Sequence, residues 1–176
     1  MISIDDSLKD VNDIYKQLMP LVDDVVSKNT KEVDAIFKNI KKDLTNLTNK
    51  ELQDYMLQLT VEAYYLTSIK DSSTLKQECA LTLLKTGQAN IFNGTAGTQN
   101  ARNNQAIVDT LDKQVVNVLY NAITNRFKSK LDEIHRMINV LSNVLISKNA
   151  EAKLRGGIKD DTHSDDIWED YKDRTR

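Results

Sequence analysis

Apolar residues recur every three or four positions along most of the chain, the spacing that places side chains on one face of a helix. A first helix is predicted from residues 5–6. Pro20 is expected to kink or interrupt it near Met19, because proline lacks the N–H that a helix interior requires. A second helix is predicted to begin at Asn29 or Thr30, since both residue types cap helices well.

Two further helices are predicted before residue 92. Thr48 and Glu51 form the Thr-x-x-Glu capping box, in which each side chain accepts a bond from the other residue's backbone N–H, so a third helix begins here. The segment "KDSS" (70–73) is expected to end that helix, and Ser72 or Ser73 to cap a fourth.

The stretch "FNGTAGTQNARNNQ" (92–105) contains a single charged residue, Arg102, in a chain that is otherwise dense in charge. Its two glycines and its threonines predict a turn between two helices, with Thr95 or Thr98 capping the second one. The alternative is a loop that contacts a ligand through Arg102 and its many amides.

The longest predicted element extends over residues 98–155, which contain neither Gly nor Pro. Roughly 50 helical residues extend over ~75 Å, more than the diameter of a compact chain of this size. Such a helix needs partners along its length, from this chain or from other copies. Gly156 and Gly157 are expected to end it, because glycine adopts the left-handed conformation of a helix C-terminus without steric cost.

The apolar stripe of this long helix changes direction along its length. We expect its first half to pack on its own chain, whereas a break near residues 120–126 is the alternative explanation. The second half is predicted to form an oligomer interface of Phe127, Leu131, Ile134, Ile138, Leu141 and Leu145.

These elements predict an all-α fold: an elongated helical bundle or hairpin with one very long C-terminal helix (about 98–155) and a disordered or extended acidic tail. One Pro and five Gly among 176 residues agree with long, uninterrupted elements. The predicted parts are N-terminal helices (1–47), a helical hairpin core with the long helix (48–157) and the tail (158–176).

Charge is distributed unevenly, although the net charge is only −2. Residues 113–159 carry +6 and residues 160–176 carry −4. Arg126, Lys130, Lys148 and Arg155 fall within about 40° on a helical wheel, and a cationic stripe of this kind attracts phosphates without recognising base sequence. The alternative is a solvated surface. The predicted nucleic-acid-binding residues are Arg102, Arg126, Lys128, Lys130, Arg136, Lys148, Lys153 and Arg155.

Catalytic and metal-binding motifs are not found in the sequence. There is no Gly-x-Ser-x-Gly elbow, phosphate loop or His-Glu-x-x-His helix, and the single cysteine, Cys79, resembles a small core residue. We therefore expect no enzyme, no metal, no cofactor and no small-molecule substrate. No apolar run approaches the ~18–20 residues that span a bilayer. A cytoplasmic protein without a membrane partner is expected, in the host cytoplasm if the source is viral.

The acidic tail contains three large apolar side chains, and an exposed Trp in an acidic segment suits a docking peptide. The tail could equally mimic nucleic acid and cover the basic face, or serve only as solubilising disorder. The predicted partner-binding residues are Ile167, Trp168 and Tyr171.

Residues 50–154 carry a characteristic order of segments: "LQDYMLQLTVEAYYLTSIK", "LKQECALTLLK", the turn "NGTAGTQNAR", and a long basic helix that ends "MINVLSNVLISKNAEAKL". In this layout the chain resembles the helical recombination mediator proteins of T4-type phages. The resemblance implies a protein that assembles into rings, binds single-stranded DNA and helps to load a recombinase. The resemblance implies a DNA-binding role for Arg102 and for the lysines and arginines of the long helix. It does not explain the first 48 residues or the tail.

The sequence therefore predicts a homo-oligomeric, non-enzymatic phage-type protein that binds single-stranded DNA as a recombination or replication accessory, together with a recombinase or another protein. The alternative is a viral structural or host-takeover protein that binds a protein partner through its long helix or the Trp168 tail.

Overall fold

The computed structural model describes residues 4–160 as helices joined by short turns, with no strand, so the predicted all-α fold is confirmed for this part of the chain. Side-chain surroundings are described for residues 11–155. Residues 161–176, which include the predicted docking residues of the tail, lie outside the described residues. The helices are α1 (Ile4–Asp43), α2 (Asn49–Gly94), α3 (Gln99–Val108) and α4 (Leu111–Asp160).

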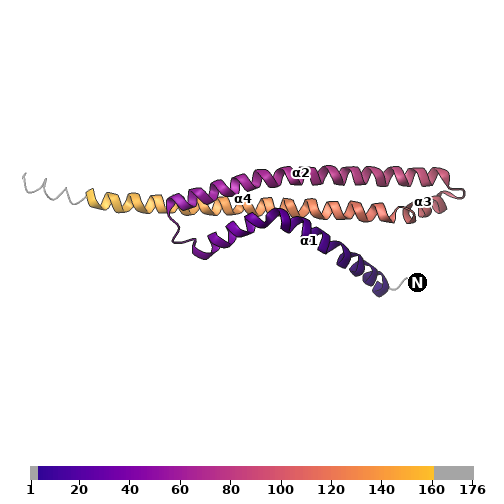
Figure 1. The fold of residues 1–176 in the computed structure, drawn as a ribbon, viewed down its shortest axis with the longest axis horizontal. Coiled ribbons are helices and arrows are strands. Elements are labelled where there is room, and N and C mark those ends of the chain that lie inside the picture. Colours follow the sequence, from indigo (N-terminus) through magenta and orange to yellow (C-terminus); the bar gives the residue numbers. More distant parts are fainter. Residues whose placement is uncertain (1–3, 161–176) are drawn as a thin grey trace, which may run out of the picture.

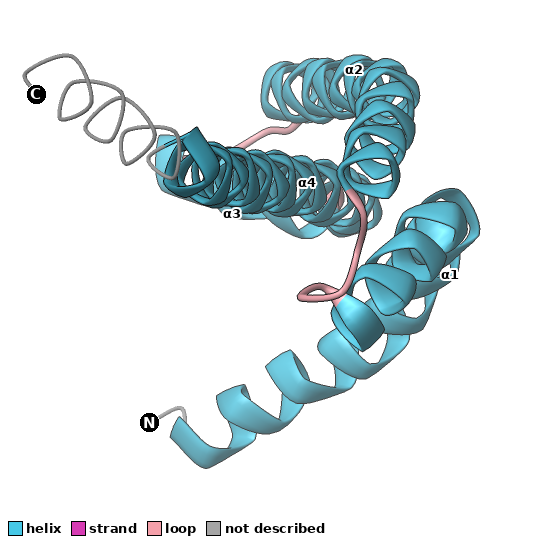
Figure 2. Ribbon diagram, turned by 90° about the vertical axis from the view of Figure 1, so that its left-hand side faces the viewer, coloured by secondary structure: helices cyan, strands magenta, loops and turns pink. Residues whose placement is uncertain are grey.

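α2 and α4 lie side by side in opposite directions and form a long hairpin (Figure 1). α3 lies at the far end of this hairpin, in contact with α2. α1 packs against the hairpin with its C-terminal part, and its N-terminal part diverges from both other long helices (Figures 1 and 2). Along a large part of its length, the hairpin of α2 and α4 is therefore not covered by α1.

The core lies where α1, α2 and α4 meet. Leu52, Leu59 and Leu66 recur every seven residues on α2 and are fully buried, the repeat that forms the seam of a coiled coil. Phe127 of α4 is the largest of the fully buried side chains. Apolar side chains of α1, among them Phe37, complete the cluster.

The six residues predicted to form an oligomer interface belong to this core. The buried ones contact other helices of their own chain and are not available to a second copy in this fold, contrary to the prediction. Helical periodicity identifies a buried face, but it does not identify what covers that face. Four of the six are buried: Phe127, Leu131, Ile134 and Leu141. Ile138 and Leu145 are partly buried and pack against the core.

Local capping signals placed two helix starts correctly. At the start of α2, the backbone N–H of Thr48 donates to Glu51 Oε2 over 2.7 Å, and the N–H of Glu51 donates to Thr48 Oγ1 over 3.2 Å. At the start of α3, the N–H of Ala101 donates to Thr98 Oγ1 over 3.3 Å. Between α2 and α3, Gly97 has a φ of 124°, a conformation that strains any other residue. The predicted turn between two helices is confirmed here.

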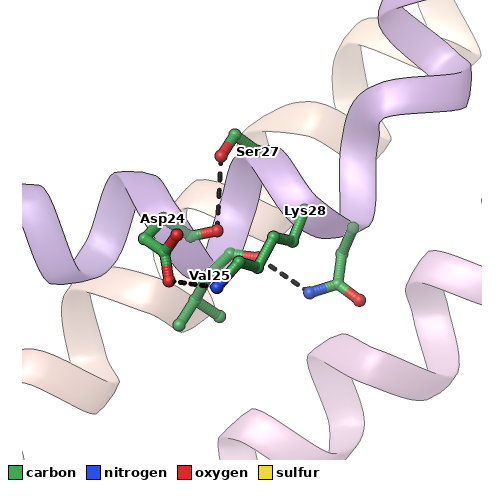
Figure 3. Close-up of polar contacts among 5 residues, drawn as sticks. Asp24, Val25, Ser27 and Lys28 are labelled. Carbon is green, nitrogen blue, oxygen red and sulfur yellow. Dashed lines mark hydrogen bonds and ion pairs between the residues drawn. The ribbon is translucent and has the colours of Figure 1, made fainter.

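The separate helix predicted to begin at Asn29 or Thr30 is wrong, because α1 continues through both residues to Asp43. Pro20 lies inside α1 and does not interrupt it, which was one of the two effects predicted for this proline. Asn29 was expected to cap a new helix. Its Nδ2 instead donates to Val25 O of the preceding turn over 2.7 Å, and Ser27 Oγ donates to Asp24 O over 3.3 Å (Figure 3). These polar side chains could cap the start of a helix, but here they donate hydrogen bonds to backbone carbonyls inside α1.

The break predicted at residues 70–73 is also wrong, because α2 continues through "KDSS". Ser73 is buried, and Thr74 Oγ1 donates to Lys70 O over 2.9 Å. Ser73 lines a hollow together with Leu21 of α1 and Ile123 of α4, so other helices form its surroundings. Capping preference is a weak signal that tertiary contacts override.

The long helix predicted over 98–155 is divided into α3 and α4 by a turn at Asp109 and Thr110. Thr110 is fully buried, and its Oγ1 donates to Ala106 O over 2.7 Å. Gln105 Nε2 donates to both carboxylate oxygens of Asp109 over 2.8 Å. Thr110 Oγ1 thus takes the Ala106 carbonyl that a continuous helix would pair with the N–H of Thr110, and that N–H donates to Ile107 O over 3.3 Å instead.

The predicted C-terminus of the long helix is wrong as well. α4 passes through Gly156 and Gly157 and extends to Asp160. Two consecutive glycines lower helix propensity by about 2 kcal/mol relative to alanine, and this cost does not end the helix here.

We predict that Phe127→Ala lowers the free energy of unfolding by about 3–5 kcal/mol, because it removes a fully buried ring and leaves a cavity between the helices. Val118→Ala, on an exposed part of α4, is expected to change it by no more than about 0.5 kcal/mol. Urea denaturation followed by circular dichroism measures both. Equal effects of the two substitutions would contradict the central position of Phe127.

Candidate interaction surfaces

α2 has apolar side chains on two opposite sides. One side forms the core described above. On the other, six large apolar residues are 53–83% exposed and fall within about 100° of arc. The exposed Cys79 lies in the same arc. We call this surface the outer stripe of α2; its apolar residues are Leu57, Val61, Tyr64, Tyr65, Leu75 and Leu83.

Single exposed apolar residues are normal on soluble proteins, whereas an aligned set on one helix face is the pattern by which helices recognise other helices. The sequence contained this signal in the spacing of Leu57, Val61 and Tyr64 at i, i+4 and i+7. The opposite side of α2 has apolar residues of the same period, and helical spacing alone does not distinguish a covered side from an uncovered one.

A second uncovered apolar region lies between α2 and α4, beyond the part of the hairpin that α1 covers. It is a groove of about 360 Å³, lined mainly by Leu75, Cys79 and Leu83 of α2 and by Val116 and Tyr120 of α4. The groove shares three residues with the outer stripe, so the two surfaces form one continuous apolar area on the distal half of α2.

Two of the four cations predicted to form a phosphate-binding stripe are used inside the chain. Lys130 Nζ lies 2.7 Å from Asp34 Oδ1 of α1 and 2.8 Å from Glu133 Oε2. It also lies 5.0 Å from the centroid of the Phe37 ring. Burial alone lowers the pKa of Lys130, but the hydrogen bonds that its ammonium group donates to the carboxylates of Asp34 and Glu133 outweigh this effect and raise that pKa above its ordinary value. Lys130 therefore connects α4 to α1.

Lys148 connects α4 to the turn between α1 and α2. Its Nζ donates to Leu47 O over 2.6 Å and to Thr45 O over 3.1 Å. These carbonyls follow the end of α1 and have no partner in a helix, so the ammonium group satisfies them. A phosphate would have to compete with both bonds.

The other predicted cations of α4 are exposed but do not form one face. Lys128 lies about 160° around the helix from Arg126, and Arg136 about 80° from it. Arg126 also lines a hollow together with Asp23, Asp34 and Glu133, whose charges oppose phosphate. The exposed set is Arg126, Lys128, Arg136, Lys153 and Arg155.

Arg102 has a structural contact in the turn region. Its guanidinium carbon lies 4.5 Å from the centroid of the Phe92 ring, a cation–π contact that joins α3 to the end of α2. The side chain is half-buried. A ligand that binds Arg102 would have to reach a guanidinium group that already contacts the Phe92 ring.

No cluster of His, Cys, Asp and Glu that could hold a metal ion is present among the described residues. Within the same part of the chain, none of the helices combines the length and the apolar character that crossing a membrane requires.

The chain matches no protein-family model, no curated protein and no solved structure. The likeness to phage recombination mediators therefore stays a prediction from the order of its segments.

We predict that Lys130→Gln lowers the free energy of unfolding by about 1 kcal/mol, because it removes the charged link between α1 and α4 while both carboxylate partners remain half exposed. Lys128→Gln, on an exposed position of the same helix, serves as the control and is expected to change it by less than about 0.5 kcal/mol.

The sign of the pH dependence follows from the raised pKa of Lys130. The stabilisation is complete below the ordinary lysine pKa of about 10.4 and is lost as pH rises through the higher pKa of the folded state. Urea denaturation at pH 8 and at pH 11 should thus show a smaller difference between wild type and Lys130→Gln at the higher pH. A difference that grows with pH would refute the assignment.

Proposed function

We propose that this chain is a helical assembly protein that works by packing helices of other polypeptides, first of all those of its own copies, against the outer stripe of α2. The observation that carries the proposal is the exposure of the six apolar residues of that stripe on a helix whose opposite side already forms the core. A helix that is apolar on two sides is suited to two sets of helical neighbours.

The size of the stripe agrees with reversible association. Full burial of a Val, Leu or aromatic side chain contributes about 1.5–3 kcal/mol, and these residues already have part of their surface buried. About 1 kcal/mol for each of the six offsets the lower part of the estimated 4–15 kcal/mol entropic cost of association. The stripe alone therefore supports an assembly that depends on concentration, and further contacts would tighten it.

A second candidate function is binding of single-stranded DNA by such an assembly. It is supported by the exposed cations on α4, above all Lys128 and Arg136, which make no ion pair among the described residues. It ranks second because Lys130 and Lys148 contact α1 and the following turn. Copies packed side by side would bring the remaining cations of several chains together.

We predict that Val61→Lys weakens self-association at least about tenfold, because a charge must then be buried between helices. Val61 is more than half exposed, so the thermal unfolding of the monomer should barely change. Light scattering after size exclusion, over a range of protein concentrations, measures the effect.

The control for this variant is Ile146→Lys, which places the same charge on a similarly exposed apolar residue of α4 outside the stripe. It should associate as the wild type does. A wild-type protein that stays monomeric at all accessible concentrations would exclude assembly through copies.

We predict that, if DNA is bound, Lys128→Gln and Arg136→Gln each weaken the affinity for a fluorescent oligonucleotide and lower its salt dependence by about one ion per substitution. Lys38→Gln, an exposed position on α1, makes the same change in net charge and should leave affinity nearly unchanged. Absence of binding at low salt would end the DNA hypothesis and leave the assembly proposal intact.

A further inference from the structure

Eight exposed residues in the arc of the outer stripe have a spacing that reads the same in both directions; Tyr64 of the stripe is not among them, because Lys76 stands at the equivalent position. Six residues at the two ends of this set, together with two serines in the middle, stand 4, 4, 3, 4, 3, 4 and 4 positions apart. The centre of this pattern is residue 70. The eight residues are Leu57, Val61, Tyr65, Ser68, Ser72, Leu75, Cys79 and Leu83, and all are exposed.

We propose that two copies of the chain pair through this stripe, with their α2 helices antiparallel around a two-fold axis beside residue 70. This inference rests on the proposed assembly function and specifies its interface. In such a pair, residues equally distant from the axis lie at the same height. Leu57 then faces the partner's Leu83, Val61 faces the partner's Cys79, and Tyr65 faces the partner's Leu75.

The symmetry of the stripe is the reason to choose a second copy as its occupant. An isologous interface requires one surface that complements itself. Spacings of three and four follow from helix geometry on any face, but the order of residue types, with apolar residues at both ends and two serines at the centre, is also symmetric. The centre also suits close approach, because Ser68 and Ser72 are the smallest residues of the set and lie where the two helices would meet. Large apolar residues on both sides would then enclose this contact.

Charges beside the stripe agree with the arrangement. Glu62 and Lys76 flank the stripe on the same side and lie almost equally far from residue 70, so each would face the opposite charge of the partner. Asp71 would approach its own symmetry mate near the axis. Its carboxylate lies 2.9 Å from Lys70 Nζ within the chain, which reduces that repulsion.

The native cysteine makes the register directly testable. Val61→Cys would stand at the same height as the partner's Cys79, the chain's other thiol, whereas the two positions within one chain are about 27 Å apart along α2. A disulfide requires Cα atoms within about 7 Å, so a bond between them can only join two chains. Glutathione disulfide serves as the oxidant and accepts the two electrons.

We expect Val61→Cys to form covalent dimers, twice the 20.0 kDa of the chain, at least about ten times faster than two controls. The wild type is the first control, because its two Cys79 thiols would lie about 27 Å apart in the pair. Thr86→Cys is the second: it is exposed on the same face, but about 38 Å from the partner's Cys79. Peptide mapping of the dimer should identify the bond between positions 61 and 79.

Three results of the disulfide experiment would overturn the proposal. Fast dimers of the wild type through Cys79 would indicate parallel helices, and equal rates for Val61→Cys and Thr86→Cys would indicate association without a register. No disulfide, with Cys79 slow to react with a thiol reagent, would indicate that another segment covers the stripe. If light scattering still gives an oligomer in these cases, the assembly function stands and only the interface is wrong. A wild type that is monomeric in light scattering would exclude both the assembly function and the proposed interface.

Discussion

The seam between α2 and α4 is the constraint on which the rest of the structure depends. Leu52, Leu59 and Leu66 meet the side of α4 that carries Phe127 and Leu141, and this contact aligns two helices of 46 and 50 residues along their length. A seam uses one side of each helix. Because α1 covers only part of the hairpin, such long helices keep apolar surface that their own chain cannot bury.

The same seam decides which charges are free. α1 packs beside α4, so Lys130 meets Asp34, and the turn that follows α1 brings the carbonyls of Thr45 and Leu47 to Lys148. Two cations that form part of a phosphate-binding stripe on a helical wheel thus stabilise the chain itself. A wheel shows which residues share a side of one helix, but it omits the neighbours that occupy that side.

Long helices and self-association remain connected, although the surface differs from the one expected. The sequence predicted that α4 would recruit other copies through the side that carries Phe127. That side is buried in the chain, and the uncovered apolar surface belongs mainly to α2. The proposed two-fold pairing of α2 would leave the exposed cations of α4 outside the contact, so assembly and nucleic-acid binding would use separate surfaces of the hairpin.

The sequence by itself determined the features that depend on neighbouring residues: an all-helical chain, the capping box at Thr48, and the turn capped by Thr98. Two of its wrong helix boundaries fell at Asn29 and Ser73, whose residue types cap a helix or lie within one with similar free energy. Only the tertiary structure decided between those states, because contacts with other helices supply the difference. For the same reason, it alone decided which of the two apolar sides of α2 is buried.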